Sequence, residues 1–390
     1  MKLLHLSING INLFRDGLEL DFIARQRVTD NNSENLTHLF SSIYKQDILG
    51  IIGINASGKT TALRWISLIL DIYLREGKVN DKDHRVLLQN QTITAEAYFS
   101  DGINLYKIQS LIKPAEDGEP IFDEERLWIK KQTKTLSRIK LLEFTDHHLD
   151  TVRSKEELSF LSDYMSIMIS LKKKHGTNPI VVDQLQDTNI NLMRVIGDVP
   201  TEVIQFLDDN IEYVSYDGNS EGKIHIQLKF KNKEDIIYIY DPLQLPIYLS
   251  SGTIKGLNVF AGIENVMASG GFLIVDELEN HFNEAIVRMI IQMFKHKDIN
   301  VMGATLIFTT HYAALLDEFD RNDTIYISFK EETLHLKNMY DLLDRNDFKK
   351  SDVYQSSYLG KTAPSYEAYM GLKNYFLQLG KNIRNKMESK

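Results

Sequence analysis

The chain has 390 residues, of which 43% are hydrophobic and 25% are charged, a composition that allows a large buried core and argues against a disordered protein. Its 45 basic and 54 acidic residues give a net charge of −9, which excludes a protein that coats nucleic acid with its whole surface. It has no cysteine, which excludes a disulfide framework, a thiolate nucleophile and a cysteine-based metal site.

The amino-terminal residues alternate between apolar and polar and predict two strands, at residues 5–13 and 18–22, joined by a turn at 15–17. This segment lacks the continuous apolar run of a signal peptide, so we expect no export and a cytoplasmic location. No apolar run approaches the roughly 18 residues that cross a bilayer, and we expect no membrane partner.

Residues 47–53 form a continuous apolar run, which is typical of a buried parallel strand. Apolar residues then recur at three- and four-residue steps over residues 60–74, which predicts a helix that faces the core. Residues 92–99 and 104–112 predict a hairpin around the turn at 101–102.

The pattern changes between residues 114 and 213, where charge density rises and strand patterns disappear. A helical stripe is formed there by Leu158, Leu161, Met165, Met168 and Ile169. We therefore predict a helical insertion that splits the core.

Strands are predicted again at residues 225–230, 236–240, 272–275 and 305–308, with helices at 283–297 and 365–387. The sequence thus predicts an α/β protein with four segments. These are an amino-terminal part of the core (1–113), the helical insertion (114–213), a carboxyl-terminal part of the core (214–350) and a helical tail (351–390).

The clearest motif follows the first buried strand. Residues 53–60, Gly-Ile-Asn-Ala-Ser-Gly-Lys-Thr, fit the phosphate-loop pattern G-x-x-x-x-G-K-[ST] between a strand and a helix. Lys59 would place its charge on the phosphate oxygens, and the Thr60 hydroxyl would ligate Mg²⁺. The predicted nucleotide-binding residues are Gly53, Asn55, Ala56, Ser57, Gly58, Lys59, Thr60 and Thr61.

A second buried strand, 272–275, ends in Asp276 and Glu277. This is how a strand delivers carboxylates to the edge of a sheet, and it is the pattern of a Walker B motif. We expect Asp276 to hold Mg²⁺ and Glu277 to act as general base for the attacking water. A third apolar strand ends at His311.

The segment Leu-Ser-Ser-Gly-Thr at 249–253 lies 24 residues (276 − 252) before Asp276. In this order the motifs resemble those of ATP-binding-cassette (ABC) ATPases, whose signature L-S-G-G-Q occupies that place; Ser251 and Thr253 depart from it. The L-S-S-G-T form is similar to that of stand-alone cassette ATPases related to the overcoming-lysogenisation-defect proteins and to Rad50 and SMC heads. Residues 353–369 resemble the carboxyl-terminal segment of AAA_15- and AAA_21-type cassette ATPases found in bacterial anti-phage systems.

The resemblance implies a P-loop fold with an ABC core, made of a mixed-sheet lobe and a parallel-sheet lobe. It implies that Ser250, Ser251 and Gly252 face the γ-phosphate of ATP held by a second copy, and that His311 contacts the γ-phosphate of its own ATP. Residues 279–283 would run along the dimer interface. Gln89 or Gln91 would be the glutamine that senses Mg²⁺ and water.

The implied function is ATP binding and hydrolysis with Mg²⁺ by a homodimer or higher homo-oligomer. The chain would sense infection and regulate a separately encoded effector, a nuclease or toxin. The alternative is a Rad50- or SMC-like ATPase that acts on DNA directly, but those proteins carry far longer heptad insertions. A basic stretch (Lys130, Lys131, Lys134, Arg138, Lys140) could touch nucleic acid, although a solvated helix face is the favoured interpretation.

Overall fold

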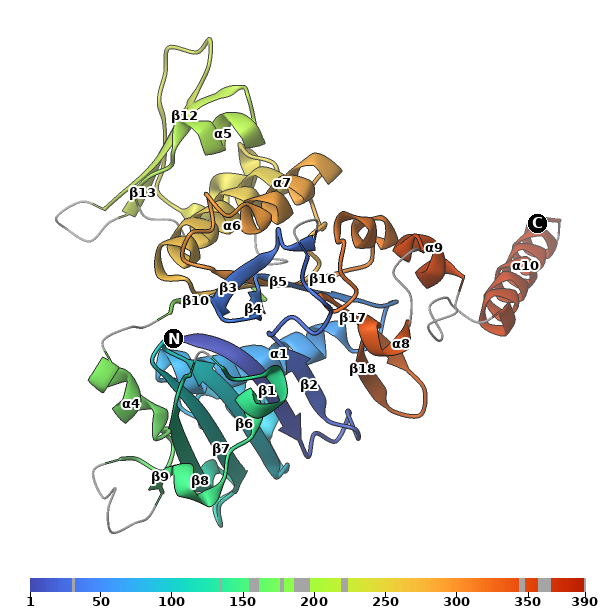
Figure 1. The fold of residues 1–390 in the computed structure, drawn as a ribbon. Coiled ribbons are helices and arrows are strands. Elements are labelled where there is room, and N and C mark those ends of the chain that lie inside the picture. The colour runs from blue at the N-terminus through green and yellow to red at the C-terminus, as the bar shows by residue number, and fades with distance from the viewer. Residues whose placement is uncertain are drawn as a thin grey trace.

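The computed structural model describes residues 1–29, 32–133, 135–153, 161–175, 179–185, 197–218, 224–343, 348–356 and 366–388. Within these residues, two six-stranded sheets enclose the helix α1 (Lys59–Leu70), as Figure 1 shows. Among the described helices, none is both long enough and apolar enough to cross a membrane.

One sheet is antiparallel, with the strand order β2-β1-β6-β7-β8-β9. Its strands are β1 (Lys2–Asn9), β2 (Leu18–Asp21), β6 (Ile93–Ser100), β7 (Asn104–Pro114), β8 (Pro120–Lys131) and β9 (Leu149–Val152). Apolar side chains on one face of this sheet, such as Leu6, Ile8 and Ala97, pack against α1. The opposite face is partly covered by α3 (Arg138–Leu142).

The other sheet has the order β10-β15-β16-β5-β17-β18 and is parallel except for its edge strand β18. Its strands are β5 (Ile48–Ile52), β10 (Val181–Asp183), β15 (Phe272–Val275), β16 (Thr305–Thr310), β17 (Ile325–Lys330) and β18 (Leu334–Asn338). Every residue of β5, β15 and β16 is buried, because helices cover both faces of this sheet.

Side chains of β5 alternate between two cores. Leu49 and Ile51 point to the core that contains α1, whereas Ile48 and Ile52 point to the core on the other face. That second core is closed by α6 (Ser251–Ser269) and α7 (Glu284–Lys295). The period-two alternation of a strand thus explains why a continuous apolar run is needed here.

A four-stranded sheet, β11-β12-β13-β14, stands apart at the top of Figure 1. It consists of β11 (Gly197–Asp198), β12 (Ile211–Gly218), β13 (Ile224–Phe230) and β14 (Ile237–Ile239), with α5 (Thr201–Leu207) beside it. Its core includes Ile254 and Leu257 from the start of α6, so this sheet is joined to the body through that helix.

The remaining elements are short or peripheral. They are β3 (Leu36–Phe40), β4 (Ile43–Gln46), the π-helical turn η2 (Asp71–Arg75), α2 (Lys82–Leu88), the 3₁₀ turns η3 (Asp146–His148), η5 (Pro242–Ile247) and η6 (Ala313–Glu318), α4 (Met168–His175), α8 (Met339–Leu342), α9 (Lys350–Gln355) and α10 (Tyr366–Glu388). The helix α10 projects away from the body at the right of Figure 1.

The prediction of a helical insertion at residues 114–213 is wrong for much of that segment. Residues 120–131 form β8, which pairs with β7 along its whole length, and residues 181–183 form β10 in the parallel sheet. Of the predicted helical stripe, Met168 and Ile169 lie in α4, Leu161 and Met165 lie outside any helix, and Leu158 is outside the described residues. Strands β12 and β13 then form a hairpin that begins within the predicted insertion.

The other predicted elements are confirmed with small shifts of their ends. They include the first two strands, the buried strand β5, helix α1, the hairpin of β6 and β7, strands β15 and β16, helix α7 and the tail helix α10. The hairpin of β3 and β4 and the pair of β17 and β18 were not predicted. The basic stretch lies on β8 and α3 rather than on one helix, and its Lys134 is outside the described residues.

Candidate active site

Three strands of the parallel sheet end at the same edge. The register pairs Val275 of β15 with Phe308 of β16, and Thr310 of β16 with Ile52 of β5. The residues that follow these strands, at 53–58, 276–277 and 311, are therefore brought together, although the first group lies more than 200 positions before the other two in the chain.

The loop at residues 53–58 requires two of its glycines. A side chain on Gly53 would lie 2.3 Å from Ser57 Oγ and 2.4 Å from Ser328 O, and Gly58, the N-cap of α1, has φ +99°. Asn55 and Ala56 are exposed at the tip of the loop, while Thr61 is half-buried in the first turn of α1. The sequence therefore folds here into a tight turn that leads directly into the N-terminus of α1, the end at which a helix offers backbone N–H groups to an anion.

The Lys59 side chain curls back over this loop. Its Nζ donates to the backbone oxygens of Gly53 (2.9 Å) and Ile54 (3.1 Å) and lies 3.2 Å from His311 Nδ1. Burial lowers the pKa of Lys59, and the neighbouring carboxylates oppose this shift. The Ser57 hydroxyl is buried without a hydrogen-bond partner among the described atoms. The loop thus holds a cation and a buried, unpaired hydroxyl within one tight turn.

A chain of hydrogen bonds joins α1 to the two carboxylates. The Thr60 hydroxyl donates to Asp276 Oδ2 at 2.7 Å, and the Thr309 hydroxyl donates to Asp276 Oδ1 at 2.5 Å. Thr309 Oγ1 also accepts from the backbone N–H of Glu277 at 2.7 Å. Thr309 therefore fixes both the side chain of Asp276 and the backbone of Glu277.

Glu277 is held in an unusual conformation. Its φ is +46°, in the left-handed region that residues with a side chain seldom adopt. Its carboxylate accepts from His311 Nε2 at 3.1 Å. Because His311 Nδ1 then accepts from Lys59, the imidazole carries its proton on Nε2 and connects the cation of the loop to the carboxylate of Glu277.

The donor set near Asp276 suits a magnesium ion. Thr60 Oγ1 and Asp276 Oδ2 are hard oxygen ligands only 2.7 Å apart, directly beside the phosphate loop. These are the two residues that the sequence predicts as metal ligands, and the structure brings them together.

The predicted signature residues lie against a different segment. Ser250 is the N-cap of α6, and its Oγ accepts from the N–H of Thr253 at 3.0 Å. Ser251 Oγ lies 3.1 Å from His281 Nδ1, and a side chain on Gly252 would lie 2.5 Å from His281 O. Ser251 and Gly252 therefore lie against His281. Among the described residues, the three signature residues form no hydrogen bond with the phosphate loop of the same chain.

Lys255, in the second turn of α6, was missed by the sequence analysis. Its Nζ donates to the backbone oxygens of Glu277 (3.0 Å) and Asn280 (2.9 Å) and lies 5.0 Å from the centre of the Phe282 ring. Burial lowers the pKa of Lys255 to about 8, although nearby acidic groups favour its charged form. This lysine ties the signature helix to the strained backbone at Glu277.

The glutamine predictions do not agree with the structure. Gln91 accepts from the backbone N–H of Asn12 and donates to Leu87 O, and Gln89 is exposed at the end of α2. In the described chain neither hydrogen bonds to the site. Gln184 instead follows β10, the strand beside β15. Its backbone N–H donates to Ile274 O at 3.0 Å, and its side-chain amide donates to Asn258 O of α6 at 2.8 Å. The apolar run 180–182 before Asp183 and Gln184 was the overlooked signal.

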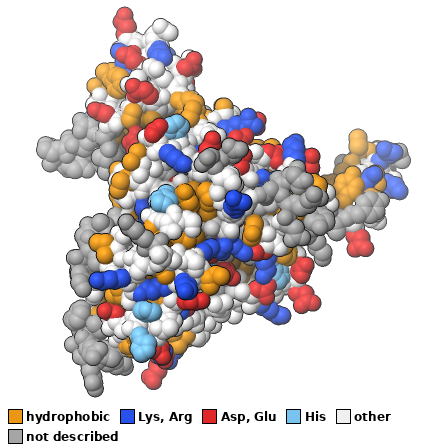
Figure 2. Space-filling view, viewed as in Figure 1, with side chains coloured by type: hydrophobic (Ala, Val, Ile, Leu, Met, Phe, Trp, Pro, Cys, Tyr) orange, Lys and Arg blue, Asp and Glu red, His pale blue; other side chains and the backbone are white. Residues whose placement is uncertain are grey.

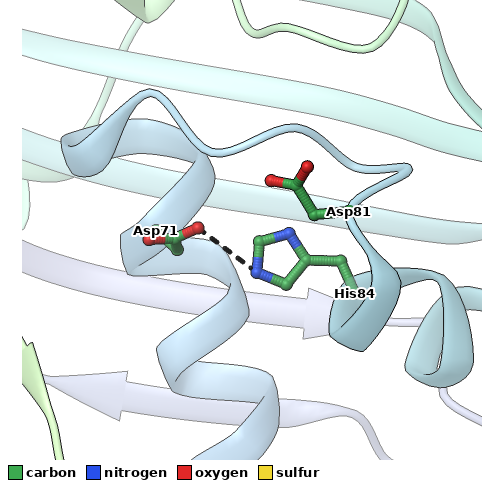
Figure 3. Close-up of side chains that lie close together, drawn as sticks. All are labelled: Asp71, Asp81 and His84. Atoms are coloured by element: carbon green, nitrogen blue, oxygen red, sulfur yellow. Dashed lines mark ion pairs between the residues drawn. The ribbon is translucent and has the colours of Figure 1, made fainter.

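A second polar cluster lies at the opposite end of α1 (Figure 3). Asp71, Asp81 and His84 each offer one ligand atom, all within 4.8 Å of one another. His84 Nε2 lies 3.3 Å from Asp71 Oδ2, its Nδ1 bonds to Lys78 O at 2.7 Å, and Asp81 accepts from the Lys78 N–H. The three side chains thus brace η2 against the start of α2, away from the phosphate loop.

Two of the comparisons with known proteins give a match. A family model described as "AAA domain, putative AbiEii toxin, Type IV TA system" matches residues 177–317. Among solved structures, the chain is similar to one described as "Crystal structure of the SmcHead bound to the C-winged helix domain of ScpA". The two chains are 13% identical, and the match has a TM-score of 0.44 and covers 88% of this chain and 100% of that chain. No curated protein matches the chain.

The family match confirms the resemblance to AAA_21 proteins that the motifs indicated. It covers the segment from β10 through residues 250–252, Asp276, Glu277 and His311. The succession of β5, the loop at 53–58 and α1 within a mixed α/β structure confirms the predicted P-loop fold.

Proposed function

We propose that this chain, a P-loop protein whose residues 177–317 match the AAA_21 domain, binds ATP with Mg²⁺ and hydrolyses it at the edge of the parallel sheet. The observation that carries this proposal is the 2.7 Å hydrogen bond between Thr60 and Asp276. It joins the phosphate loop to an acidic strand end, which is the combination that phosphoryl transfer with a metal requires.

Each group at the site has one role in the proposed reaction. The N–H groups of the loop and Lys59 hold the phosphates and offset their charge. Glu277 accepts a proton from a water molecule as the oxygen of that water bonds to the γ-phosphorus. The bond from this phosphorus to the oxygen it shares with the β-phosphate breaks, which yields ADP and phosphate. His311 holds the Glu277 carboxylate in place through its Nε2–H.

Thr60 and Asp276 would hold the magnesium ion, which draws charge from the phosphate oxygens when it is bound. Gln184 replaces Gln89 and Gln91 in our assignment of the glutamine that responds to the metal and water, because it follows the strand beside β15.

Two copies would enclose two ATP molecules, as the family resemblance implies. Ser250 is exposed at the N-terminus of the 19-residue helix α6, where unpaired N–H groups and the helix dipole favour an anion. The γ-phosphate of ATP bound to a second copy is the anion that Ser250, Ser251 and Gly252 would meet.

The biological role that we propose is regulation of a separate effector protein, a nuclease or toxin, in anti-phage defence. The support is the match to a domain described as belonging to a toxin–antitoxin system. ATP binding would close the dimer, and hydrolysis at Glu277 would release it.

The proposal is tested with two variants and one control. Lys59→Ala removes the cation of the phosphate loop, so ATP binding weakens at least about 100-fold and phosphate release falls to background. Ser250→Arg fills the surface that would meet the second copy, so ATP binding stays within a few-fold of wild type but ATP no longer draws the two copies together around the nucleotide. Lys82→Ala, at an exposed position of α2, leaves both properties unchanged.

The two outcomes are independent. Wild-type ATP turnover by Lys59→Ala would show that the phosphate loop is not the active site. If ATP still draws two copies of Ser250→Arg together as it does in wild type, measured as the change in particle mass and radius by small-angle X-ray scattering, the assignment of the signature to the partner's phosphate is wrong, whereas the ATPase assignment stands.

A further inference from the structure

The helix α10 exposes a regular apolar seam, which we define as Tyr369, Leu372, Phe376, Leu379 and Ile383. These residues follow one another at steps of three, four, three and four. They therefore lie on one face of the helix, with the 3.5-residue repeat of the a and d positions of a coiled coil. Figure 2 shows hydrophobic and basic side chains together on this helix at the right of the molecule.

This helix has no partner in the described part of the chain. Hydrogen bonds, ion pairs and ring contacts to other described elements are all lacking for α10, and its described side chains are exposed apart from half-buried Met370. It also contains Gly371 and Gly380, each of which costs a helix about 1 kcal/mol relative to alanine. Since isolated helices are marginal in water, α10 needs a surface on which to bury its seam.

The seam is complementary to itself. A 3.5-residue repeat packs best against a helix with the same repeat, and a second copy of this chain supplies one. The described positions that flank the seam are Lys373, Tyr375, Gly380 and Asn382, and only the first of these is charged. Lys381 and Arg384 lie on the outer face of the helix. Two copies can therefore meet without setting rows of like charge against each other.

The exposed area is sufficient for a specific contact. The seam residues are 40% to 60% exposed, so that each would bury on the order of 100 Å² and the two helices together about 1,000 Å². This value lies at the lower limit for a specific interface, and Tyr375, whose ring contacts Phe376, widens it.

We propose that α10 pairs with α10 of a second copy along this seam, in a two-stranded coiled coil that joins the copies without nucleotide. The two copies would then be held at a high effective concentration, so that ATP closes a pair that is already joined. This inference goes beyond the proposed ATPase and does not depend on it.

The absence of cysteine from the chain makes a direct test available. Phe376→Cys introduces a single thiol in the centre of the seam, and Gln378→Cys introduces one on the outer face of the same helix. The full-length variants are treated with a mild oxidant without nucleotide. We expect Phe376→Cys to form a disulfide-linked dimer at least ten times more completely than Gln378→Cys. Equal crosslinking of the two variants would overturn the proposal.

A second variant tests the contact without a covalent bond. Leu372→Glu places a charge in the seam, and we expect light scattering without ATP to show a dimer for wild type and for Lys59→Ala but a monomer for Leu372→Glu. A monomeric wild type at micromolar concentrations would overturn the proposal. The same monomer would be observed if α10 folded back on its own chain, so that arrangement would overturn it as well. Lys59→Ala does not bind ATP in our proposal, so a Lys59→Ala dimer would show that pairing through α10 needs no nucleotide. The result for α10 is therefore independent of the test of the ATPase assignment.

Discussion

The hydroxyl of Thr309 holds both acidic residues of the site in place, Asp276 through its side chain and Glu277 through its backbone. It is fully buried, donates to Asp276 and accepts from the N–H of Glu277. The left-handed backbone of Glu277 is a strained conformation that persists only where its surroundings hold it. Thr309 and Lys255 provide two of the contacts that do so.

Thr309→Val keeps the shape of this side chain and removes both hydrogen bonds. A buried polar group left without its partner costs about 1–3 kcal/mol, so we expect kcat to fall about 10- to 100-fold with little change in ATP affinity. Steady-state phosphate release measures the effect. Thr310→Val, one position along β16, removes only the hydrogen bond from the N–H of Tyr312 (3.0 Å), which does not involve Asp276 or Glu277, so its kcat should fall much less. Equal losses for both would mean that the effect is general damage to the strand.

Lys255 allows a prediction on pH. Its pKa is about 8 in the folded protein and near 10.4 when unfolded. Between these values the unfolded chain binds more protons, so stability rises with pH in that window. Well below pH 8, both states are protonated and the folded state carries the cost of a buried charge.

We therefore expect the melting temperature of wild type, relative to Lys255→Met, to increase as pH rises from 8 to 10. Exposed Lys330→Met serves as the control and should show a constant difference from wild type. A difference between wild type and Lys255→Met that does not change with pH would contradict the role of burial.

Among the helices and strands, sequence patterns predict correctly those elements whose burial is encoded by their own residues. A five-residue apolar run predicts β5, and three- to four-residue spacing predicts α1, because burial on two faces or on one stripe is encoded within the element itself. The phosphate loop, the acidic strand end and His311 followed from those strands, since parallel strands deliver their ends to one edge.

Prediction failed where an element depends on distant partners. β10 has only three residues and pairs with β15, about 90 positions away, so the short apolar run before Gln184 is a weak signal on its own and was overlooked. β8 has a mixed pattern with charged residues such as Glu125, whose carboxylate is buried only because Arg153 and Ser166 satisfy it. Lys255 looked like an ordinary helix residue for the same reason.

Gly271 tests the packing of the parallel sheet. A side chain there would lie 1.9 Å from Ile180 O, directly before β10. We expect Gly271→Ala to lower the free energy of unfolding by about 1–3 kcal/mol. Gly371→Ala, in the interior of α10 with no atom within 4 Å, should instead leave stability unchanged or raise it by up to about 1 kcal/mol. Urea unfolding compares the two; a harmless Gly271→Ala would contradict the close approach.

In the whole molecule, one site is assembled from the ends of three strands, and two other features, helix α6 and the seam of α10, bear on its proposed function. The signature helix α6 is tied to Glu277 through Lys255 and also contributes to the core of the four-stranded sheet. The seam of α10 lies far from the phosphate loop, at the end of the chain. The proposed nucleotide-driven contact at residues 250–252 and the proposed pairing of α10 thus involve separate parts of the chain.

The most direct test of the central claim is ATP turnover by Glu277→Gln. The amide keeps the shape of the side chain but cannot accept the proton of the attacking water, so we predict ATP binding close to wild type, phosphate release reduced at least about 100-fold, and an ATP-bound dimer that persists. Glu264→Gln, at an exposed position of α6, should behave as wild type. Phosphate release by Glu277→Gln at the wild-type rate would contradict the account.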